Sequence, residues 1–169
     1  MRTILPWIGL LMLVSATANA ETAVILTQKS APLRIIKYDA TYQEESRTAY
    51  SSHSDQIKHT VSCENLSDKR VVAFQIGLVA FDAFNDFMDK FDGWSFKTLN
   101  TGENGESVWT QSPYAAFSFR KYGTGVAYVS AVRFEDGAIW RANLAEILLE
   151  LQKFEKDLKR EDLEEKKKP

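Results

Sequence analysis

Two histidines and one nearby carboxylate are the residues of this sequence best suited to binding a transition metal. His53 and His59 are the only histidines, and Asp55 lies between them. Imidazole nitrogens and carboxylate oxygens are ordinary ligands of such ions. In an extended chain, however, the two histidines would be separated by roughly 20 Å, because a strand rises about 3.3 Å per residue. We therefore predict no metal site shared by the two histidines.

Four aspartates form a second group with the oxygen chemistry of a cation site. They recur at intervals of four, three and three residues, as Asp82, Asp86, Asp89 and Asp92. A calcium-binding EF-hand loop instead alternates its ligands around a central glycine. Because Phe84, Phe87 and Phe91 interrupt the acidic series, the pattern favours an amphipathic segment with solvated aspartates and buried phenylalanines. Calcium binding through backbone carbonyls stays an open alternative.

Nucleophilic catalysis finds no support in the sequence. Cys63 is the one cysteine, and it lies among apolar strand positions where a thiol packs more often than it reacts. No Gly-x-Ser-x-Gly elbow is present. The glycines at 102–105 and 123–125 precede strand patterns rather than the helix that a phosphate-binding loop requires. The sequence therefore predicts a non-catalytic protein without a cofactor.

Aromatic side chains are the best candidates for a binding surface, because Trp and Tyr are favoured at recognition sites. Seven are dispersed through the second half of the chain: Trp94, Phe96, Trp109, Tyr114, Tyr122, Tyr128 and Trp140. A β-sandwich core also needs large side chains, so we expect about two-thirds of them to be buried. The three nearest to turns, Trp94, Tyr114 and Tyr122, are predicted to be exposed and to form the binding surface.

Residues 1–20 have the pattern of a secretory signal peptide. Arg2 supplies a positive start, residues 4–14 are apolar, and the small residues 18–20 form a cleavage site. A membrane anchor is the alternative, but a proline and a glycine interrupt the apolar stretch, which is shorter than the roughly 20 residues that a membrane-spanning helix needs. We therefore expect cleavage after residue 20 and a periplasmic or secreted location, without stable membrane insertion.

The cysteine count and the charge narrow the class of protein further. With Cys63 alone no disulfide can form within the chain, so a bacterial envelope fits better than a disulfide-rich eukaryotic secreted domain. The formal net charge of −2 becomes −3 if Arg2 leaves with the signal peptide. Such a slightly acidic surface gives no electrostatic reason to expect a nucleic-acid partner. The 149 residues that remain when 20 are subtracted from 169 suffice for one domain.

Residues 21–142 have the pattern of a β-sandwich. Residues 55–64 alternate strictly, with His59 and Cys63 on the apolar face, which is typical of a half-buried strand. Residues 71–81 are apolar on both faces, as expected in the middle of a covered sheet. We predict that these two strands pair as a hairpin. Further strands are predicted at 33–42, 95–99, 106–111, 114–121, 125–134 and 138–140.

Three other segments separate these strands. Residues 135–137, Glu-Asp-Gly, predict a tight hairpin because Asp and Gly tolerate a positive φ. Residues 44–54 are polar and predict a loop or a poorly packed edge. Residues 82–93 fit a strand end, a hairpin arm or a short helical turn, and their pattern does not choose among the three.

Residues 143–169 change to a helical period. Apolar residues recur there at spacings of three and four: Leu144, Ile147, Leu148, Leu151, Phe154 and Leu158. Asn143 is the predicted N-cap, with Glu146 reaching back as in a capping box. Beyond Phe154 the chain is almost wholly charged and predicts a solvated helix end, the alternative being a coiled-coil contact between two chains. We expect the first half to pack on the sandwich, so that removing residues 143–169 destabilises the domain while removal from Glu155 onward costs little.

The predicted hairpin resembles a known group of domains. Its residues run Val61-Ser62-Cys63-Glu64-Asn65-Leu66-Ser67-Asp68-Lys69, then Val71, Ala73, Ile76 and Leu78, and end in Phe81-Asp82. This is similar to FxLYD-type and related immunoglobulin-like domains of bacterial envelope proteins, in which a strand ends in an Asn-x-Ser turn and the next ends in an aromatic residue followed by Asp. The resemblance implies a non-catalytic β-sandwich of about seven strands, and it transfers no catalytic residue. Residues 84–94 and the C-terminal helix lie outside it.

Together these features predict a mainly β protein, an immunoglobulin-like antiparallel β-sandwich with a C-terminal α-helix. The function they favour is that of an exported, non-catalytic interaction or structural module of the cell envelope, whose partner is another envelope protein. Oligomerisation through the C-terminal helix is a further option. The alternative is a periplasmic protein that binds a small ligand or a metal, with His53, His59 and the aspartates of residues 82–92 as candidate groups.

Overall fold

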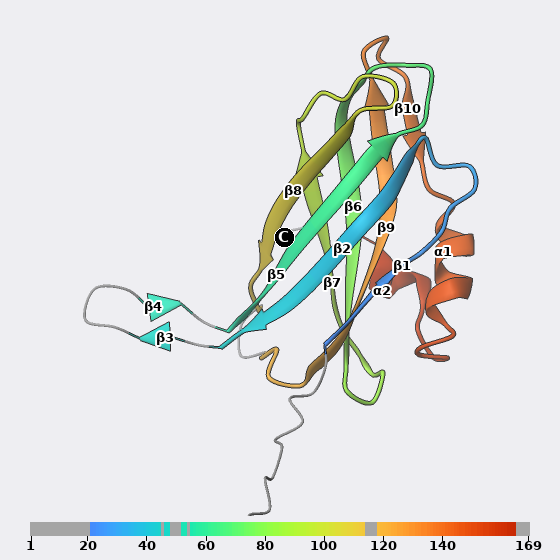
Figure 1. The fold of residues 1–169 in the computed structure, drawn as a ribbon. Coiled ribbons are helices and arrows are strands. Elements are labelled where there is room, and N and C mark those ends of the chain that lie inside the picture. The colour runs from blue at the N-terminus through green and yellow to red at the C-terminus, as the bar shows by residue number, and fades with distance from the viewer. Residues whose placement is uncertain (1–20, 45, 48–51, 54, 114–117, 165–169) are drawn as a thin grey trace, which may run out of the picture.

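Ten strands and two short helices make up the part of the chain that the structure describes. The computed structural model describes residues 21–44, 46–47, 52–53, 55–113 and 118–164. Most of the strands form two sheets that lie face to face as a sandwich, and the helices follow at the C-terminal end (Figure 1). The prediction of a mainly β protein with antiparallel sheets is confirmed. None of the described helices is long and apolar enough to cross a membrane.

The smaller sheet has three antiparallel strands. Its order is β2 (Leu33–Gln43), β5 (Gln56–Asn65) and β8 (Asn104–Gln111). The predicted alternation of β5 is confirmed, because its odd-numbered residues 57–63 are at most 1 % exposed. The opposite face of this sheet carries mainly polar side chains, as expected for a sheet with one face in water. We call it the three-stranded sheet.

The larger sheet has five strands, and β6 lies near its centre. Antiparallel pairing joins β7 (Phe87–Ser95), β6 (Val71–Asp82) and β9 (Tyr122–Phe134). The far edge of β9 is shared by β10 (Ile139–Arg141), which is antiparallel, and by β1 (Thr22–Ile25), which is parallel. The predicted hairpin between β9 and β10 is confirmed, with Gly137 at φ 85° in its turn.

The predicted hairpin between β5 and β6 is wrong, because the two strands belong to opposite sheets. The physical reason is that β6 needs cover on both faces. Its Ile76 and Leu78 face the core between the sheets, whereas Val79 and Phe81 belong to a second apolar cluster beneath the helices. Asn65 secures the crossing between sheets, since its Nδ2 donates to the carbonyls of Lys69 and Leu99 at 2.8 and 3.0 Å.

The segment whose type the sequence left open, residues 82–93, is a hairpin turn followed by most of β7. Asp82 Oδ1 accepts hydrogen bonds from the backbone N–H groups of Phe84 and Asp86, at 2.8 and 3.0 Å. Asn85 supplies the positive φ of 69° that reverses the chain. The aspartate in this turn therefore has a local structural role.

Three other strand predictions need correction or lie partly outside the described residues. The strand predicted at 95–99 does not form, because β7 ends at Ser95 and only Leu99 bridges to Val71. Residues 118–121 contain no strand, and residues 114–117 are outside the described part. Within residues 44–54, the described pieces β3 (Ser46–Arg47) and β4 (Ser52–His53) pair with each other.

The C-terminal segment forms two short helices, not one long helix. α1 (Leu144–Leu151) begins at Asn143, whose Oδ1 accepts from the N–H of Ala145 at 3.1 Å, and α2 (Arg160–Leu163) follows after a bend. A straight helix would carry Leu158 about 10 Å beyond Leu151, because each residue adds 1.5 Å. The chain instead turns back, with Gln152 Nε2 donating to the Leu158 carbonyl at 3.0 Å.

This return buries apolar residues that the charged C-terminal segment was expected to leave in water. The helices cover part of the outer face of the five-stranded sheet, and we call the buried set the helix-side cluster: Val79, Phe81, Val126, Tyr128, Ile147, Leu151, Leu158 and Leu163. Leu158 and Leu163 are each 2 % exposed. The expectation that residues from Glu155 onward can be removed at little cost is therefore wrong. Ile147, Leu151 and Leu158 of the apolar stripe are buried in this cluster, and Leu144, Leu148 and Phe154 pack against it while partly exposed.

Replacement of Leu158 or Leu163 by Ala is predicted to destabilise the protein by about 2 kcal/mol or more, because each leaves a cavity in a closed cluster. The matched control is Leu149→Ala on α1, whose side chain is 65 % exposed. That change should stay within about 0.5 kcal/mol. Guanidinium unfolding of the three variants measures the difference. Equal midpoints for Leu163→Ala and Leu149→Ala would contradict the observed burial.

Candidate binding groove

The outer face of the five-stranded sheet is covered over only part of its area. The C-terminal segment with α1 and α2 covers the part around Val79 and Phe81. The remainder is crossed by two rows of outward side chains. One row is Trp94, Gln75, Ala131 and Arg141, and the next is Ala73, Arg133 and Ile139. We call these two rows, together with Phe96, the bare half-face.

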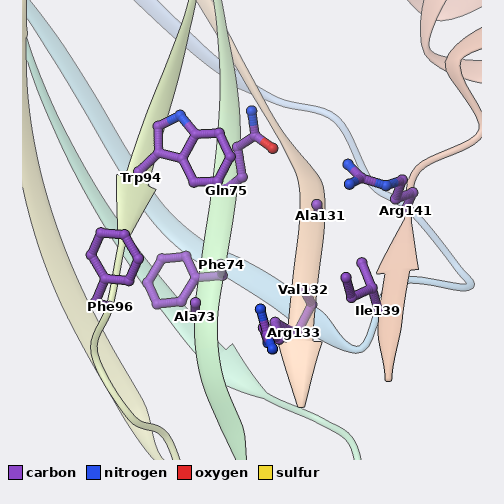
Figure 2. A pocket seen from close by; sticks show the side chains of 10 residues that line it. All are labelled: Ala73, Phe74, Gln75, Trp94, Phe96, Ala131, Val132, Arg133, Ile139 and Arg141. Carbon is purple, nitrogen blue, oxygen red and sulfur yellow. The ribbon is translucent and has the colours of Figure 1, made fainter. Parts of the chain in front are cut away.

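The bare half-face is hollowed into a groove of about 250 Å³. Ala73 and Ala131 leave its floor low, because their side chains end at Cβ. Figure 2 shows the rings of Trp94 and Phe96 on the β7 side and the side chains of Ile139 and Arg141 on the β10 side. Trp94, Phe96 and Ile139 are 55, 79 and 53 % exposed. Three large apolar side chains therefore border one shallow depression, an arrangement that marks contact surfaces on soluble proteins.

Local packing fixes the aromatic side of the groove. Trp109 of β8 donates its indole N–H to the Trp94 carbonyl at 2.9 Å and so links the two sheets. Its ring lies against Gly93, where an added Cβ would come within 2.6 Å of the indole. Glycine at this position therefore allows Trp109 to support the backbone from which Trp94 projects outward.

Polar groups in the groove are one amide and two guanidinium groups. Gln75 is only 6 % exposed, and its amide has no hydrogen-bond partner among the described residues. Arg133 and Arg141 are exposed, and neither forms an ion pair with any residue in the described ranges. No acidic residue lines the groove. The surface thus combines apolar area with unpaired positive charge and a nearly buried amide.

The sequence-predicted binding residues have three different outcomes. Trp94 is exposed, as predicted, and lies in the groove. Tyr122 is 6 % exposed, so its predicted exposure is wrong. The reason is its direction from β9: its hydroxyl lies over Gly125 inside the sandwich, beside that of Tyr38. Tyr114 lies outside the described residues.

Sequence reasoning missed the residues that complete the groove. Phe96 is one of the seven dispersed aromatic residues but not one of the three predicted to be exposed, and the sequence patterns assign no binding role to Ile139, Arg133 and Arg141. The alternation along β9 and β10 could have placed these three on one face of a hairpin. Only the pairing of β6 with β7 and β9, which is not local in sequence, brings that face beside Trp94.

His59, a candidate metal ligand, is instead part of a buried hydrogen-bonded chain. Gln111 Nε2 donates to Asp89 at 3.1 Å, so its Oε1 accepts from His59 Nε2 at 3.0 Å. His59 Nδ1 then accepts from the Tyr38 hydroxyl at 3.0 Å. The imidazole also stacks between Tyr38 and Phe91, and it is fully buried. Burial lowers the pKa of His59 to about 4 despite the hydrogen bond to Gln111. Both ring nitrogens are engaged, which leaves neither for a metal.

The other candidate ligands are also dispersed or engaged. The side chain of His53 lies outside what the structure describes. Asp82 closes its own turn, Asp89 bonds Gln111, and Asp92 pairs with Lys90. No group of three or more His, Cys, Asp or Glu suited to a metal occurs within the described ranges. Burial raises the pKa of Cys63 to about 12, so its thiol stays protonated and unreactive near neutral pH.

Comparison with known proteins gives a fold likeness only. The sequence matches no family model and no curated protein. A crystal structure of a hypothetical protein from Peptoclostridium difficile 630 is similar, with 11 % identity and a TM-score of 0.52, over 73 % of this chain and 92 % of that one. A Northeast Structural Genomics Consortium target aligns at 14 % identity with a TM-score of 0.43, over 66 % of this chain and 80 % of the other.

The buried His59 makes the stability of the protein depend on pH. Below pH 6.5 the unfolded chain takes up a proton that the folded chain, with its pKa near 4, does not. The contribution of neutral His59 to the free energy of unfolding should therefore be fully present well above pH 6.5 and should be lost progressively as the pH falls toward 4. Between pH 7.5 and pH 5 this single group should cost about 2 kcal/mol.

The control for this prediction is His59→Gln, which removes the titrating group. Urea unfolding at the two pH values should show a loss about 2 kcal/mol smaller for the variant than for the native protein. All other titrating groups are common to both proteins and cancel in the comparison. Equal losses would show that His59 is accessible to protons in the folded state.

Proposed function

We propose that this chain is an exported, non-catalytic module of the cell envelope that binds another envelope protein through the groove. The observation that carries the proposal is the incomplete cover of the five-stranded sheet, where Trp94, Phe96 and Ile139 remain in water. A soluble protein gains stability by covering such residues, and contiguous exposed apolar patches mark interaction sites. The helices cover the neighbouring part of the same face, so the bare half-face is a local exception.

The proposed location is periplasmic or secreted, and it rests on residues 1–20. Their positive start, apolar middle and small-residue end are those of a cleaved signal peptide. A core with a single buried cysteine and no disulfide is compatible with a bacterial envelope.

We further propose that the sandwich is immunoglobulin-like. The strand order supports this if β2, β5 and β8 correspond to strands A, B and E of that fold. β10, β9 and β6 then correspond to G, F and C, and β7 to the added strand C′ beside C. In this correspondence β1 is an additional strand on the β9 edge. The similar structure from Peptoclostridium difficile bears on the fold alone. In this architecture loops cluster at the two ends of the sandwich, and here part of one sheet face is uncovered as well.

The shape of the groove favours a protein partner over a small ligand. Small-molecule pockets usually exceed about 300 Å³ and bury most of the ligand surface. This groove is smaller and open, and its side chains stand out into water. The alternative function is metal binding. Within the described residues, no three His, Cys, Asp or Glu side chains come together to hold a metal ion. A protein segment can cover the large exposed apolar side chains around this open groove, which a small ligand or a metal ion would leave in water.

A photo-crosslinking experiment in the native host tests this function. Benzoylphenylalanine placed at Phe96 should give a discrete adduct with another envelope protein. The same amino acid at Val108 is the matched control, because Val108 is 51 % exposed but lies on β8 of the other sheet. Adding Ala131→Trp should fill the floor of the groove and remove the adduct from position 96.

Two results would count against the proposed function. One is the absence of any adduct at position 96, and the other is the same set of adducts from positions 96 and 108. An adduct of twice the chain mass would identify a second copy of this protein as the occupant and would replace the envelope partner in the proposal.

A further inference from the structure

We propose that the groove recognises an extended protein segment that carries two carboxylates next to a large apolar side chain. This inference rests on the proposed function, because it names the partner chemistry of the same surface. It adds that the contact is selective for acidic residues, which a purely apolar surface would not be.

The charge of the groove is opposite to that of the chain. The whole sequence has a formal net charge of −2. The residues that line the groove nevertheless include Arg133 and Arg141 and no acidic residue. Other basic groups on the surface do form ion pairs, as in Lys69 with Asp136 and Arg70 with Glu135. Two arginines without an ion pair among the described residues, both beside apolar surface, therefore present a site for carboxylates, which arginine binds well.

The register of the strands fixes where the apolar and acidic groups of the partner must lie. Arg141 pairs across β10 and β9 with Ala131, and Arg133 pairs with Ile139 one row further along. The two arginines are therefore diagonal neighbours, roughly 7–8 Å apart along the sheet, with their Cβ atoms somewhat closer than that. Carboxylates two residues apart on an extended segment are separated by about 6.7 Å and can meet one arginine each.

The other side of the groove suits an apolar side chain. A large residue of the segment would rest on Ala131 and Ala73 and against the rings of Trp94 and Phe96. The free amide of Gln75 lies at the base of the same floor. An amide both donates and accepts, so it matches a peptide group of a bound backbone.

The chain's own C-terminal segment is not the occupant. Its acidic residues at 161–165 flank Leu163, but Leu163 is 2 % exposed and is held in the helix-side cluster. Residues 166–168 are all lysine, and they would place positive charge beside two arginines. A nucleic acid would supply negative charge but would gain little from an otherwise acidic protein surface. An acidic segment of a different protein is the occupant that the charges and the apolar area select.

Selection from a random peptide library tests this inference directly. A displayed library of twelve-residue peptides is panned against the immobilised protein that starts at residue 21. We expect enrichment of peptides with two acidic residues two positions apart and a neighbouring Leu, Phe or Trp. The affinity of the best synthetic peptide should fall with rising salt and weaken about tenfold or more in the double variant Arg133→Glu, Arg141→Glu.

A control variant with the same change of charge separates local recognition from net charge. Lys37→Glu with Lys58→Glu places the same four-unit change on exposed positions of the three-stranded sheet. This variant should bind the selected peptide within about twofold of the native protein. Thermal melts of both double variants check that the fold is intact.

Three results would overturn the inference. They are enrichment of neutral or basic peptides, equal loss of binding in the two double variants, and full competition by oligodeoxythymidylate at equal charge. If peptides of this kind are not selected while crosslinking at Phe96 still captures an envelope protein, the proposed function stands and the acidic chemistry of its partner is wrong.

Discussion

The central strand β6 carries large apolar side chains on both of its faces, and both faces must be removed from water. Ile76 and Leu78 do this by facing the three-stranded sheet, and Val79 and Phe81 by lying beneath the helices. Full burial of such side chains stabilises a protein by about 2 kcal/mol each, so neither face can be left open without a large loss. The two-layer sandwich and the returning C-terminal segment are both consequences of this one strand.

The groove lies where the outer face of β6 no longer carries large apolar side chains that must be removed from water. The outer face of β6 reads Ala73, Gln75, Gly77, Val79 and Phe81, and so passes from small or polar residues to large apolar ones. The helices cover the large residues, and the half-face with alanine and glutamine remains open. Neighbouring strands then place Trp94 and Ile139 beside a low floor. A contact surface is thus formed without exposing the strand that holds the fold together.

The buried polar chain of Tyr38, His59, Gln111 and Asp89 has a different role in the same sandwich. It runs from the three-stranded sheet to β7 and satisfies every ring nitrogen of a fully buried histidine. An unpaired polar group there would cost about 1–3 kcal/mol, so these hydrogen bonds favour one relative placement of the two sheets. Because β7 also carries Trp94, the same placement fixes the aromatic side of the groove.

Local patterns in the sequence determined the type of most elements and the face of several. The alternation of β5, the two-sided apolar run of β6, the Asp-Gly turn before β10 and the N-cap at Asn143 are all set by residues close in sequence. The exposure of Trp94 was also predictable. Tertiary structure alone decided that β5 and β6 lie in different sheets, that Tyr122 points inward and that Leu158 and Leu163 are buried. It also decided that Arg133 and Arg141 join Trp94 on one surface. The physical reason is that a strand pattern defines two faces but not what covers them, since cover and register depend on contacts between segments far apart in the chain.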